Sequence, residues 1–481
     1  MYSISQNLKN VLKNRIKIIV SPILYKTIDF MVDNLFAKDV KNKYFSLISG
    51  VQTSTREIVK SIIISTFKEI DENFKNSAER KSIYYINKSS VRRTLITIVG
   101  EISFERTYYQ SKRSNKKFFY IDEMFDLPKY DHYDPIIKGI AIQNATETSQ
   151  AQSSRTITAM ISEIKFLLDN SSVTNIPRQS IYNWIREWNT PEIVPESVET
   201  PETLYVMADE KYIGAQDINK DIMVKCFVTF EDVKSVGSGR RVLVNRTVFS
   251  CYDSNAWPKF MDFIAKRYDF SKIKDIRLLG DGGIWIKSGV SELRLDQANK
   301  VKFYLCEFHF KQAIHHITTD ENERNELISI FKNKKKKDFV TKVEEIIENN
   351  SNRENIIRKK LDYILNNYTA IKSMLELKIG SSMESHISHL IASLFASRPK
   401  GFSTKRIHQY LRLNDYKNNN INIFKLYMQS YKNDEVLKIN EECTNNYVFY
   451  NFENGNIPIL CNGLTSNTYF ELQSVSHWFI K

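Results

Sequence analysis

The chain has 481 residues, of which 42% are hydrophobic and 26% charged, with 14 glycines and 10 prolines. This composition is typical of a soluble globular protein with roughly three or four domains, and the few glycines and prolines argue against long disordered tracts. Lysine and arginine number 69 against 56 aspartates and glutamates, so the formal net charge is +13. A basic balance favours polyanionic partners, because lysine and arginine neutralise phosphates. A lysine- and asparagine-rich genome composition would give the same charge without such a partner.

The cysteines and the hydropathy pattern indicate the cellular compartment. The five cysteines are irregularly spaced and fit a reducing cytosol better than a disulfide framework. No run of the sequence approaches the ~20 apolar residues of a membrane-spanning helix. We therefore expect a cytoplasmic protein that does not enter a membrane.

The N-terminal part is predicted to begin with helices and continue with strands. Residues 1–85 carry apolar residues at helical spacing, among them Ile58, Ile62 and Phe67. Residues 86–130 indicate a β-hairpin, whose turn we place at Gly100-Glu101. Basic residues flank this hairpin: Arg92, Arg93, Arg106, Lys112, Arg113, Lys116 and Lys117. The first three of these are candidates for contact with DNA.

Residues 131–190 are predicted to be helical and resemble a helix-turn-helix. A helix near 155–169 is followed by a loop at 170–175 and by a second helix at 177–188, which opens with Pro177. In a helix-turn-helix the first residues of the second helix reach base edges. Suitable side chains here are those of Arg178, Gln179, Ser180 and Asn183. The alternative is an ordinary helix pair that buries Ile181, Trp184, Ile185 and Trp188.

The pattern after residue 203 predicts an α/β core. Residues 191–203 form a linker rich in proline and glutamate. Strands are then expected at Leu204–Ile213, Ile222–Val233, Val242–Tyr252, Asp275–Leu279 and Val301–Leu305, with a helix at Ala256–Tyr268. The order β-β-β-α-β-α-β is ribonuclease-H-like, and we place this core at 204–309.

The remaining chain is predicted to be mostly helical. An all-helical insertion is expected at 310–378 and a further core helix within 379–412. Residues 413–481 have no assignable role. The predicted fold class is therefore α+β and multidomain.

Two carboxylates lie at informative positions of the predicted core. Asp209 lies in the first strand, and Asp281 follows the fourth strand within Gly280-Asp-Gly-Gly283. The first and fourth strands are neighbours in this strand order, so the two carboxylates would face each other at one sheet edge. A carboxylate after an apolar run is costly to desolvate unless it is paired or binds a cation. The alternative for Asp281 is a simple Asp-Gly turn.

Short motifs in a fixed order resemble the DDE transposases of bacterial insertion sequences, above all the ISLre group on the Mutator-like branch. The motifs are Met207-Ala-Asp-Glu-Lys-Tyr212, Gly280-Asp-Gly-Gly-Ile-Trp-Ile286, Cys306-Glu-Phe-His309 and a later glutamate in a helix. The N-terminal hairpin and Phe119-Tyr-Ile-Asp-Glu123 are also similar to that family. The resemblance covers roughly 90–412. It implies an enzyme that binds the ends of an insertion sequence, cleaves to free a 3′-OH and transfers it to target DNA.

In that family the third carboxylate follows a helical insertion, which favours Glu384 at the edge of an apolar helical stripe. Glu376 is the alternative. The downstream Ser397-Arg-Pro-Lys-Gly-Phe402 resembles the family's basic stretch, although Phe402 stands where tryptophan is expected. Arg398 and Lys400 are therefore further candidates for contact with DNA.

Cys306 and His309 have a spacing that also suggests zinc. We do not favour zinc, because a structural site usually needs four ligands and no second pair lies at zinc-finger spacing. The resemblance instead implies that His309 supports the scissile phosphate or positions a catalytic carboxylate. A partly buried, hydrogen-bonded histidine is the alternative.

The predicted cofactor is Mg²⁺, as two ions that Mn²⁺ can replace, held by Asp209, Asp281 and Glu384. The predicted partners are transposon-end and target DNA, with a second copy of the chain on paired ends, in the bacterial cytoplasm at the nucleoid. The main alternative is a DNA-binding regulator or inactive domesticated transposase that uses only the N-terminal region. A ribonuclease-H-like nuclease without strand transfer is a third possibility.

Overall fold

The computed structural model describes residues 6–36, 42–169, 175–237, 241–294, 299–377, 390–391, 395 and 401–431. The chain divides into two compact units, and each is described by itself. Unit 1 comprises Met1–Trp184 and Phe424–Lys481, and unit 2 comprises Ile185–Ile423. Helices and mixed sheets make this an α+β protein. No helix of the described residues is long and apolar enough to cross a membrane.

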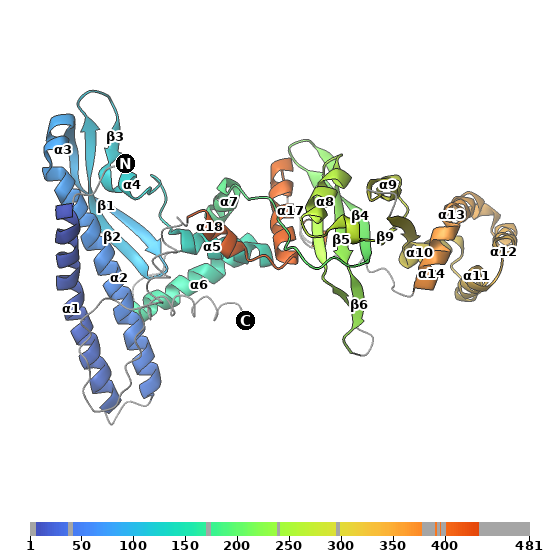
Figure 1. Ribbon diagram of the computed structural model, residues 1–481, viewed down its shortest axis with the longest axis horizontal. Coiled ribbons are helices and arrows are strands. Elements are labelled where there is room, and N and C mark those ends of the chain that lie inside the picture. Colours follow the sequence, from blue (N-terminus) through green and yellow to red (C-terminus); the bar gives the residue numbers. More distant parts are fainter. Residues whose placement is uncertain are drawn as a thin grey trace. The chain divides into compact units, whose positions relative to one another are not determined.

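Unit 1 begins with a helical hairpin. Helices α1 (Gln6–Phe36) and α2 (Lys43–Asn76) run side by side, and both extend past the neighbouring sheet (Figure 1). The side chain of Asn42 caps α2 by accepting a hydrogen bond from the Phe45 N–H. A short helix, α3 (Ala78–Ile83), follows. The prediction of helices before residue 85 is confirmed for these elements.

A three-stranded antiparallel sheet packs on α2. Its strands are β1 (Tyr84–Thr97), β2 (Gly100–Ser111) and β3 (Lys117–Phe119). The predicted hairpin exists, but its two-residue turn is Ile98-Val99 rather than Gly100-Glu101. Gly100 is the first residue of β2 and has a φ of 108°, which favours glycine. The core between sheet and helix contains Phe67, Ile70, Phe74, Ile102, Phe104 and Tyr109.

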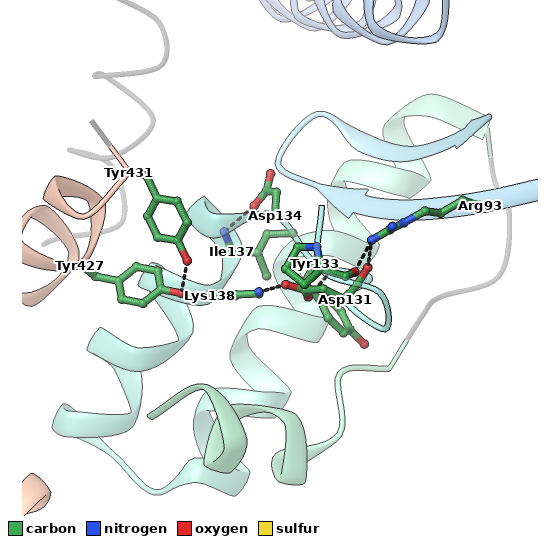
Figure 2. Close-up of polar contacts among 9 residues, drawn as sticks. Arg93, Asp131, Tyr133, Asp134, Ile137, Lys138, Tyr427 and Tyr431 are labelled. Carbon is green, nitrogen blue, oxygen red and sulfur yellow. Dashed lines mark hydrogen bonds and ion pairs between the residues drawn. The ribbon is translucent and has the colours of Figure 1, made fainter. Parts of the chain in front are cut away.

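Further helices of unit 1 follow the sheet. They are α4 (Tyr120–Met124), α5 (Pro135–Glu147), α6 (Gln150–Asp169), α7 (Arg178–Glu187), which reaches into unit 2, and α18 (Ile423–Gln429). Asp134 ties α5 to the hairpin turn, because its carboxylate accepts hydrogen bonds from Ile137 N at 2.7 Å and from Ile98 N at 3.0 Å (Figure 2 shows the first of these). Pro135 follows as the first helical residue.

Unit 2 is built on a five-stranded sheet in the order β10-β9-β4-β5-β8. The strands are β4 (Thr203–Ala215), β5 (Lys220–Phe230), β8 (Thr247–Cys251), β9 (Asp275–Gly280) and β10 (Lys300–Leu305). β4 pairs parallel with β9, and β9 pairs parallel with β10, whereas the β4–β5 and β5–β8 pairs are antiparallel. The prediction that the first and fourth strands of the core are neighbours is confirmed.

The predicted strand at Val242–Tyr252 is two strands. Its first part, β7 (Arg241–Val244), pairs with β6 (Asp232–Ser235) in a separate ribbon that extends from the sheet (Figure 1). Only the second part, β8, joins the main sheet. Asn245 separates the two with a φ of 51°, and this left-handed conformation interrupts an extended strand.

Helices cover both faces of the main sheet. Helices α8 (Ala256–Ala265) and α9 (Ile284–Glu292) share a core with Val206, Phe227 and Cys251. Helix α17 (Thr404–Asn418) packs on β8, where Asp415 accepts hydrogen bonds from Ser250 N at 2.7 Å and Ser250 Oγ at 2.8 Å. Successive residues of a strand point to opposite faces, so α8 and α17 lie on opposite sides of β8.

The expected linker is held against unit 2 by its main chain. Residues 189–202 contain no helix or strand. Arg412 donates to the carbonyl of Thr190 at 2.6 Å, and Arg267 donates to that of Glu196 at 2.9 Å. This segment is therefore a packed strap and does not act as a free tether.

The segment 310–378 was predicted to be helical, and it is helical as far as Leu377. Its helices are α10 (Glu307–Ile317), α11 (Glu321–Asn333), α12 (Lys336–Asn349), α13 (Glu354–Asn366) and α14 (Tyr368–Leu377). They form a core of their own, which includes Phe310, Leu327, Phe331, Phe339 and Leu361. Helix α17 runs through the boundary that we placed at residue 412 and ends at Asn418.

Candidate metal centre

Three carboxylates meet at one edge of the main sheet. Asp209, Glu210 and Asp281 each offer an oxygen atom, and these atoms all lie within 4.8 Å of one another. Asp209 and Glu210 belong to β4, and Asp281 follows the last residue of β9. β4 and β9 are parallel neighbours whose pairing ends at Met207 and Leu279, and the acidic residues of both chains lie just past that last pair. The predicted juxtaposition of Asp209 and Asp281 is present.

The glycines around Asp281 are explained by close packing. A Cβ atom on Gly280 would lie 2.6 Å from Ile286 Cγ2, and one on Gly282 would lie 2.9 Å from Leu305 Cδ1. Gly282 also has a φ of 90°, which a residue with a Cβ rarely adopts. Asp281 Oδ1 accepts a hydrogen bond from Gly283 N at 2.8 Å. The Asp-Gly turn that we weighed against a ligand role is thus present, and it fixes one carboxylate oxygen of Asp281.

Glu210 is a site residue that sequence reasoning missed. Neighbouring residues of a strand point to opposite faces, so the pattern offered no reason to combine Glu210 with Asp209. Trp285 Nε1 donates a hydrogen bond to Glu210 Oε2 at 2.5 Å. Burial raises the pKa of Glu210, the Trp285 hydrogen bond lowers it, and the charge of Asp281 raises it. The charge of Lys225 lowers the pKa as well, but burial outweighs it.

The β10–α10 junction and the inserted helices contact the same edge. Cys306 N donates to the carbonyl of Gly280 at 2.9 Å. From α13, Tyr363 donates its hydroxyl proton to the carbonyl of Asp281 at 2.5 Å. Burial is the main reason that the pKa of Tyr363 is raised, with a further contribution from the charge of Asp281. The main chain at Asp281 is therefore held from both sides.

His309 lies in the first turn of α10. Its Nδ1 atom is buried and has no hydrogen-bond partner in the described part of the chain. Within the described ranges, the one cluster suited to a metal ion contains neither Cys306 nor His309.

One of the two candidates for the third carboxylate can be placed, and it is not part of this cluster. Glu384 lies outside the described residues, and so do Arg398 and Lys400. Glu376 is exposed at the end of α14 and is absent from the acidic group.

Two of the three arginines that we expected to contact DNA are buried. Arg93 and Arg106 both form ion pairs with Asp122, the first with a separation of 2.9 Å. Arg93 also donates to the carbonyls of Pro128 at 2.8 Å and Asp131 at 2.7 Å (Figure 2). Burial is the main cause of the lowered pKa of Arg93. These arginines hold the sheet to residues 120–131, which argues against our expectation, whereas Arg92 is exposed.

Helix α7 has the two faces that either interpretation of residues 131–190 requires. Its apolar residues Ile181, Trp184 and Ile185 are buried. Arg178 and Gln179 are exposed, and Ser180 and Asn183 are half-buried. Gln179 Nε2 donates to Asn183 Oδ1 at 3.3 Å. The polar side chains therefore remain available on the surface.

Comparison with known proteins assigns a family. The uncharacterised protein family UPF0236 matches residues 42–431. A UPF0236 protein of Caldanaerobacter subterraneus subsp. tengcongensis is 28% identical over 385 residues, which cover 78% of each chain. A second from this organism is 26% identical over 400 residues, 80% of each chain, and its name joins eleven locus designations. The match spans the hairpin sheet, α7, the main sheet and the acidic cluster, and the chain therefore belongs to the UPF0236 family.

Proposed function

We propose that this chain is a DNA transposase of the DDE type, which cleaves and rejoins phosphodiester bonds with divalent metal ions. The observation that carries the proposal is the meeting of Asp209 and Asp281. They are 281 − 209 = 72 residues apart in the sequence, yet their oxygen atoms approach within 4.8 Å just past the last residues through which β4 and β9 pair in parallel. Such convergence of carboxylates at one sheet edge suits metal-assisted phosphoryl transfer.

The topology of unit 2 supports a ribonuclease-H-like core. An antiparallel meander, β4-β5-β8, continues into two parallel strands, β9 and β10, on the other side of β4. Helices lie on both faces, and the helical insertion follows β10. This arrangement is consistent with the strand order that the sequence predicts, and it gives the first and fourth core strands the positions that a paired carboxylate site needs.

The ligand set suits Mg²⁺. All three clustered groups offer carboxylate oxygen, the ligand that Mg²⁺ prefers. In our proposal Asp209, Asp281 and Glu384 hold two ions, and Glu210 is a further ligand or a proton acceptor. When bound, the ions would activate the attacking oxygen and stabilise the leaving oxygen. The protein's own part is to fix Asp281 through Gly283 and Tyr363, and to orient Glu210 through Trp285.

Two further observations favour a mobile DNA element as the substrate. The net charge of +13 favours a polyanion, and exposed basic side chains near the hairpin include Arg92, Lys112 and Arg113. A relative whose one name joins eleven locus designations in a single strain is what a self-copying DNA element would produce. Exposed Arg178 and Gln179 on α7 are the proposed base-reading residues.

The test is cleavage of DNA taken from the borders of the chain's own gene. The full chain would be incubated with labelled border DNA in Mg²⁺ or EDTA. We expect a Mg²⁺-dependent nick that exposes a 3′-OH. Asp281→Asn keeps the oxygen that accepts from Gly283 but removes the charge. This variant should lose at least about 100-fold in cleavage, since even loss of a metal's outer contacts costs 10–100-fold.

Glu292→Gln is the matched control, because Glu292 is an exposed carboxylate on α9, the helix after Asp281. It should cleave as the wild type does. Cleavage by Asp281→Asn at the wild-type rate would refute the site. Border binding without a nick in Mg²⁺ or Mn²⁺ would refute the enzyme and favour the DNA-binding regulator.

A further inference from the structure

Five exposed lysines gather where helix α11 ends and helix α12 begins. We call them the lysine patch, and its members are Lys332, Lys334, Lys335, Lys336 and Lys337. Within the described part of the chain, none of the five forms an ion pair. Other cations of the inserted helices do, since Lys311, Lys342 and Arg358 each have a carboxylate partner. The patch is therefore a concentration of positive charge without paired carboxylates.

The position of the patch works against the stability of α12. The N-terminal end of a helix carries a partial positive charge, so a lysine there is unfavourable and a carboxylate is favourable. Lys336 and Lys337 lie in the first turn of α12, and Lys335 is its N-cap. Asp338 offsets part of this charge, because its carboxylate accepts a hydrogen bond from Lys335 N at 3.2 Å. Helix stability does not explain the other cations, whereas an anionic partner would.

The base of the patch is held by packing between α11 and α14. Lys372 of α14 donates from Nζ to the carbonyl of Lys332 at 2.8 Å, and this satisfies one of the last carbonyl groups of α11. The rings of Phe331 and Tyr368 lie 4.8 Å apart. The five lysines of the patch therefore extend from a packed base, and their side chains are exposed to solvent.

The patch is connected to the turn at Asp281 through α14. Lys336 Nζ lies 5.6 Å from the ring centre of Tyr368, the first residue of that helix. The preceding residue, Asn367, contacts the turn, because a Cβ atom on Gly282 would lie 3.2 Å from Asn367 Oδ1. Each step is a contact or a peptide bond, so Lys336 lies within roughly 34 Å of the acidic cluster, the length of one turn of duplex DNA.

We propose that the lysine patch binds the phosphate backbone of duplex DNA that passes the acidic cluster. The choice of DNA rests on the proposed function, because a centre that cleaves phosphodiester bonds brings this polyanion to the neighbouring surface. Lysine ammonium groups contact phosphates as point charges, and such contacts do not read the base sequence. The patch therefore strengthens the binding of any duplex and fixes its position relative to the acidic cluster.

The test is the binding of labelled duplex DNA to the full chain, measured by fluorescence anisotropy in EDTA, which prevents metal-dependent cleavage. One duplex has the border sequence of the gene and the other an unrelated sequence. The triple variant Lys334→Gln, Lys335→Gln, Lys337→Gln removes three charges, keeps good helix formers and leaves Lys336 on Tyr368. Each phosphate contact contributes about 0.9 to the slope of log affinity against log salt. Between about 50 and 200 mM salt, the variant's slope should be smaller by about 2–3 with both duplexes.

The matched control is the triple variant Lys272→Gln, Lys274→Gln, Lys300→Gln, which removes the same charge from exposed residues of unit 2. These lysines lie before or at the start of β9 and β10, whereas Asp281 follows the end of β9. The control should bind both duplexes with the wild-type slope. Equal losses of slope in the two triple variants would overturn the proposal, because net charge alone would then account for them.

Three further results decide between this proposal and its alternatives. An unchanged slope in a patch variant that circular dichroism shows to be folded would overturn it, even if the wild type nicks border DNA. Patch-dependent binding of an RNA duplex without binding of DNA would also overturn it. Patch-dependent binding of both DNA duplexes without any nick in Mg²⁺ would support the lysine patch and count against the proposed enzyme. If the triple variant does not fold, Lys334→Gln, which lies between the two helices, should lower the slope by about 0.9.

Discussion

Replacing Gly282 by alanine tests how the turn at Asp281 is held. The new Cβ atom would lie 2.9 Å from Leu305 Cδ1 and 3.2 Å from Asn367 Oδ1. The left-handed backbone costs about 1–2 kcal/mol for a residue with a Cβ. Overpacking against Leu305 of β10 and against Asn367, the residue before α14, costs about 1–3 kcal/mol more. We therefore expect a loss of about 2–5 kcal/mol in the free energy of unfolding.

The control for this variant is Gly237→Ala. Gly237 has a φ of 121° at the end of β6, but a Cβ atom there would have nothing within 4 Å. It tests backbone strain without crowding, so its cost should stay near about 1–2 kcal/mol. The difference between the two variants isolates the packing cost.

The assay is urea unfolding followed by tryptophan fluorescence, since Trp257 and Trp285 lie in the core of unit 2 or packed against it. A loss of 3 kcal/mol lowers the midpoint by roughly 1 M urea at a slope of about 3 kcal/mol/M. Equal midpoints for Gly282→Ala and Gly237→Ala would refute the packing argument. In that case close approach to a ligand would remain the explanation for the Gly-Asp-Gly-Gly sequence.

Two other predictions concern buried charges. Burial raises the pKa of Asp415 above its ordinary value of 3.8, so the folded chain holds this proton to higher pH than the unfolded chain. The free energy of unfolding should therefore fall as pH rises from that value through the folded pKa, by up to about 1.4 kcal/mol per pH unit. Urea titrations of Asp415→Asn at several pH values should lack this fall in the free energy of unfolding. If the free energies of variant and wild type changed in parallel with pH, the prediction would be contradicted. Asp122→Asn should lower the free energy of unfolding, measured by heat or urea, by about 3–5 kcal/mol, because two buried arginines lose their counter-charge. The control Glu123→Gln breaks only an exposed pair with Lys116, and it should cost less than about 1 kcal/mol. Equal losses for the two variants would count against the burial argument.

The sequence was sufficient to predict the pairing of Asp209 with Asp281. Strand periodicity located both strands, and the strand order made them neighbours, so no knowledge of side-chain packing was needed. Glu210 was missed because strand alternation separates it from Asp209. Both residues of β4 lie past Met207, the last residue of that strand that pairs with β9, and both offer an oxygen atom to the group that contains Asp281.

The burial of Arg93 and Arg106 was not predictable for a different physical reason. Arginine is usually exposed, and its burial depends on a partner that composition cannot reveal. Asp122 lies 29 residues after Arg93 and 16 after Arg106, and it reaches both only after the sheet has folded. The strand break at Asn245 was equally hidden, because an asparagine in the left-handed region looks like any polar residue within a strand.

The hydrogen bond between Tyr363 and Asp281 has a consequence for the timing of synthesis. Its two residues are 82 positions apart, and β4, β9 and β10 all precede Tyr363 in the chain. At about 5–20 residues per second, a ribosome needs roughly 4–16 s to make the intervening segment. During that interval a nascent chain carries all three clustered acids but lacks the tyrosine that fixes the main chain of one of them. Completion of the centre is thereby delayed until the inserted helices have been translated and folded.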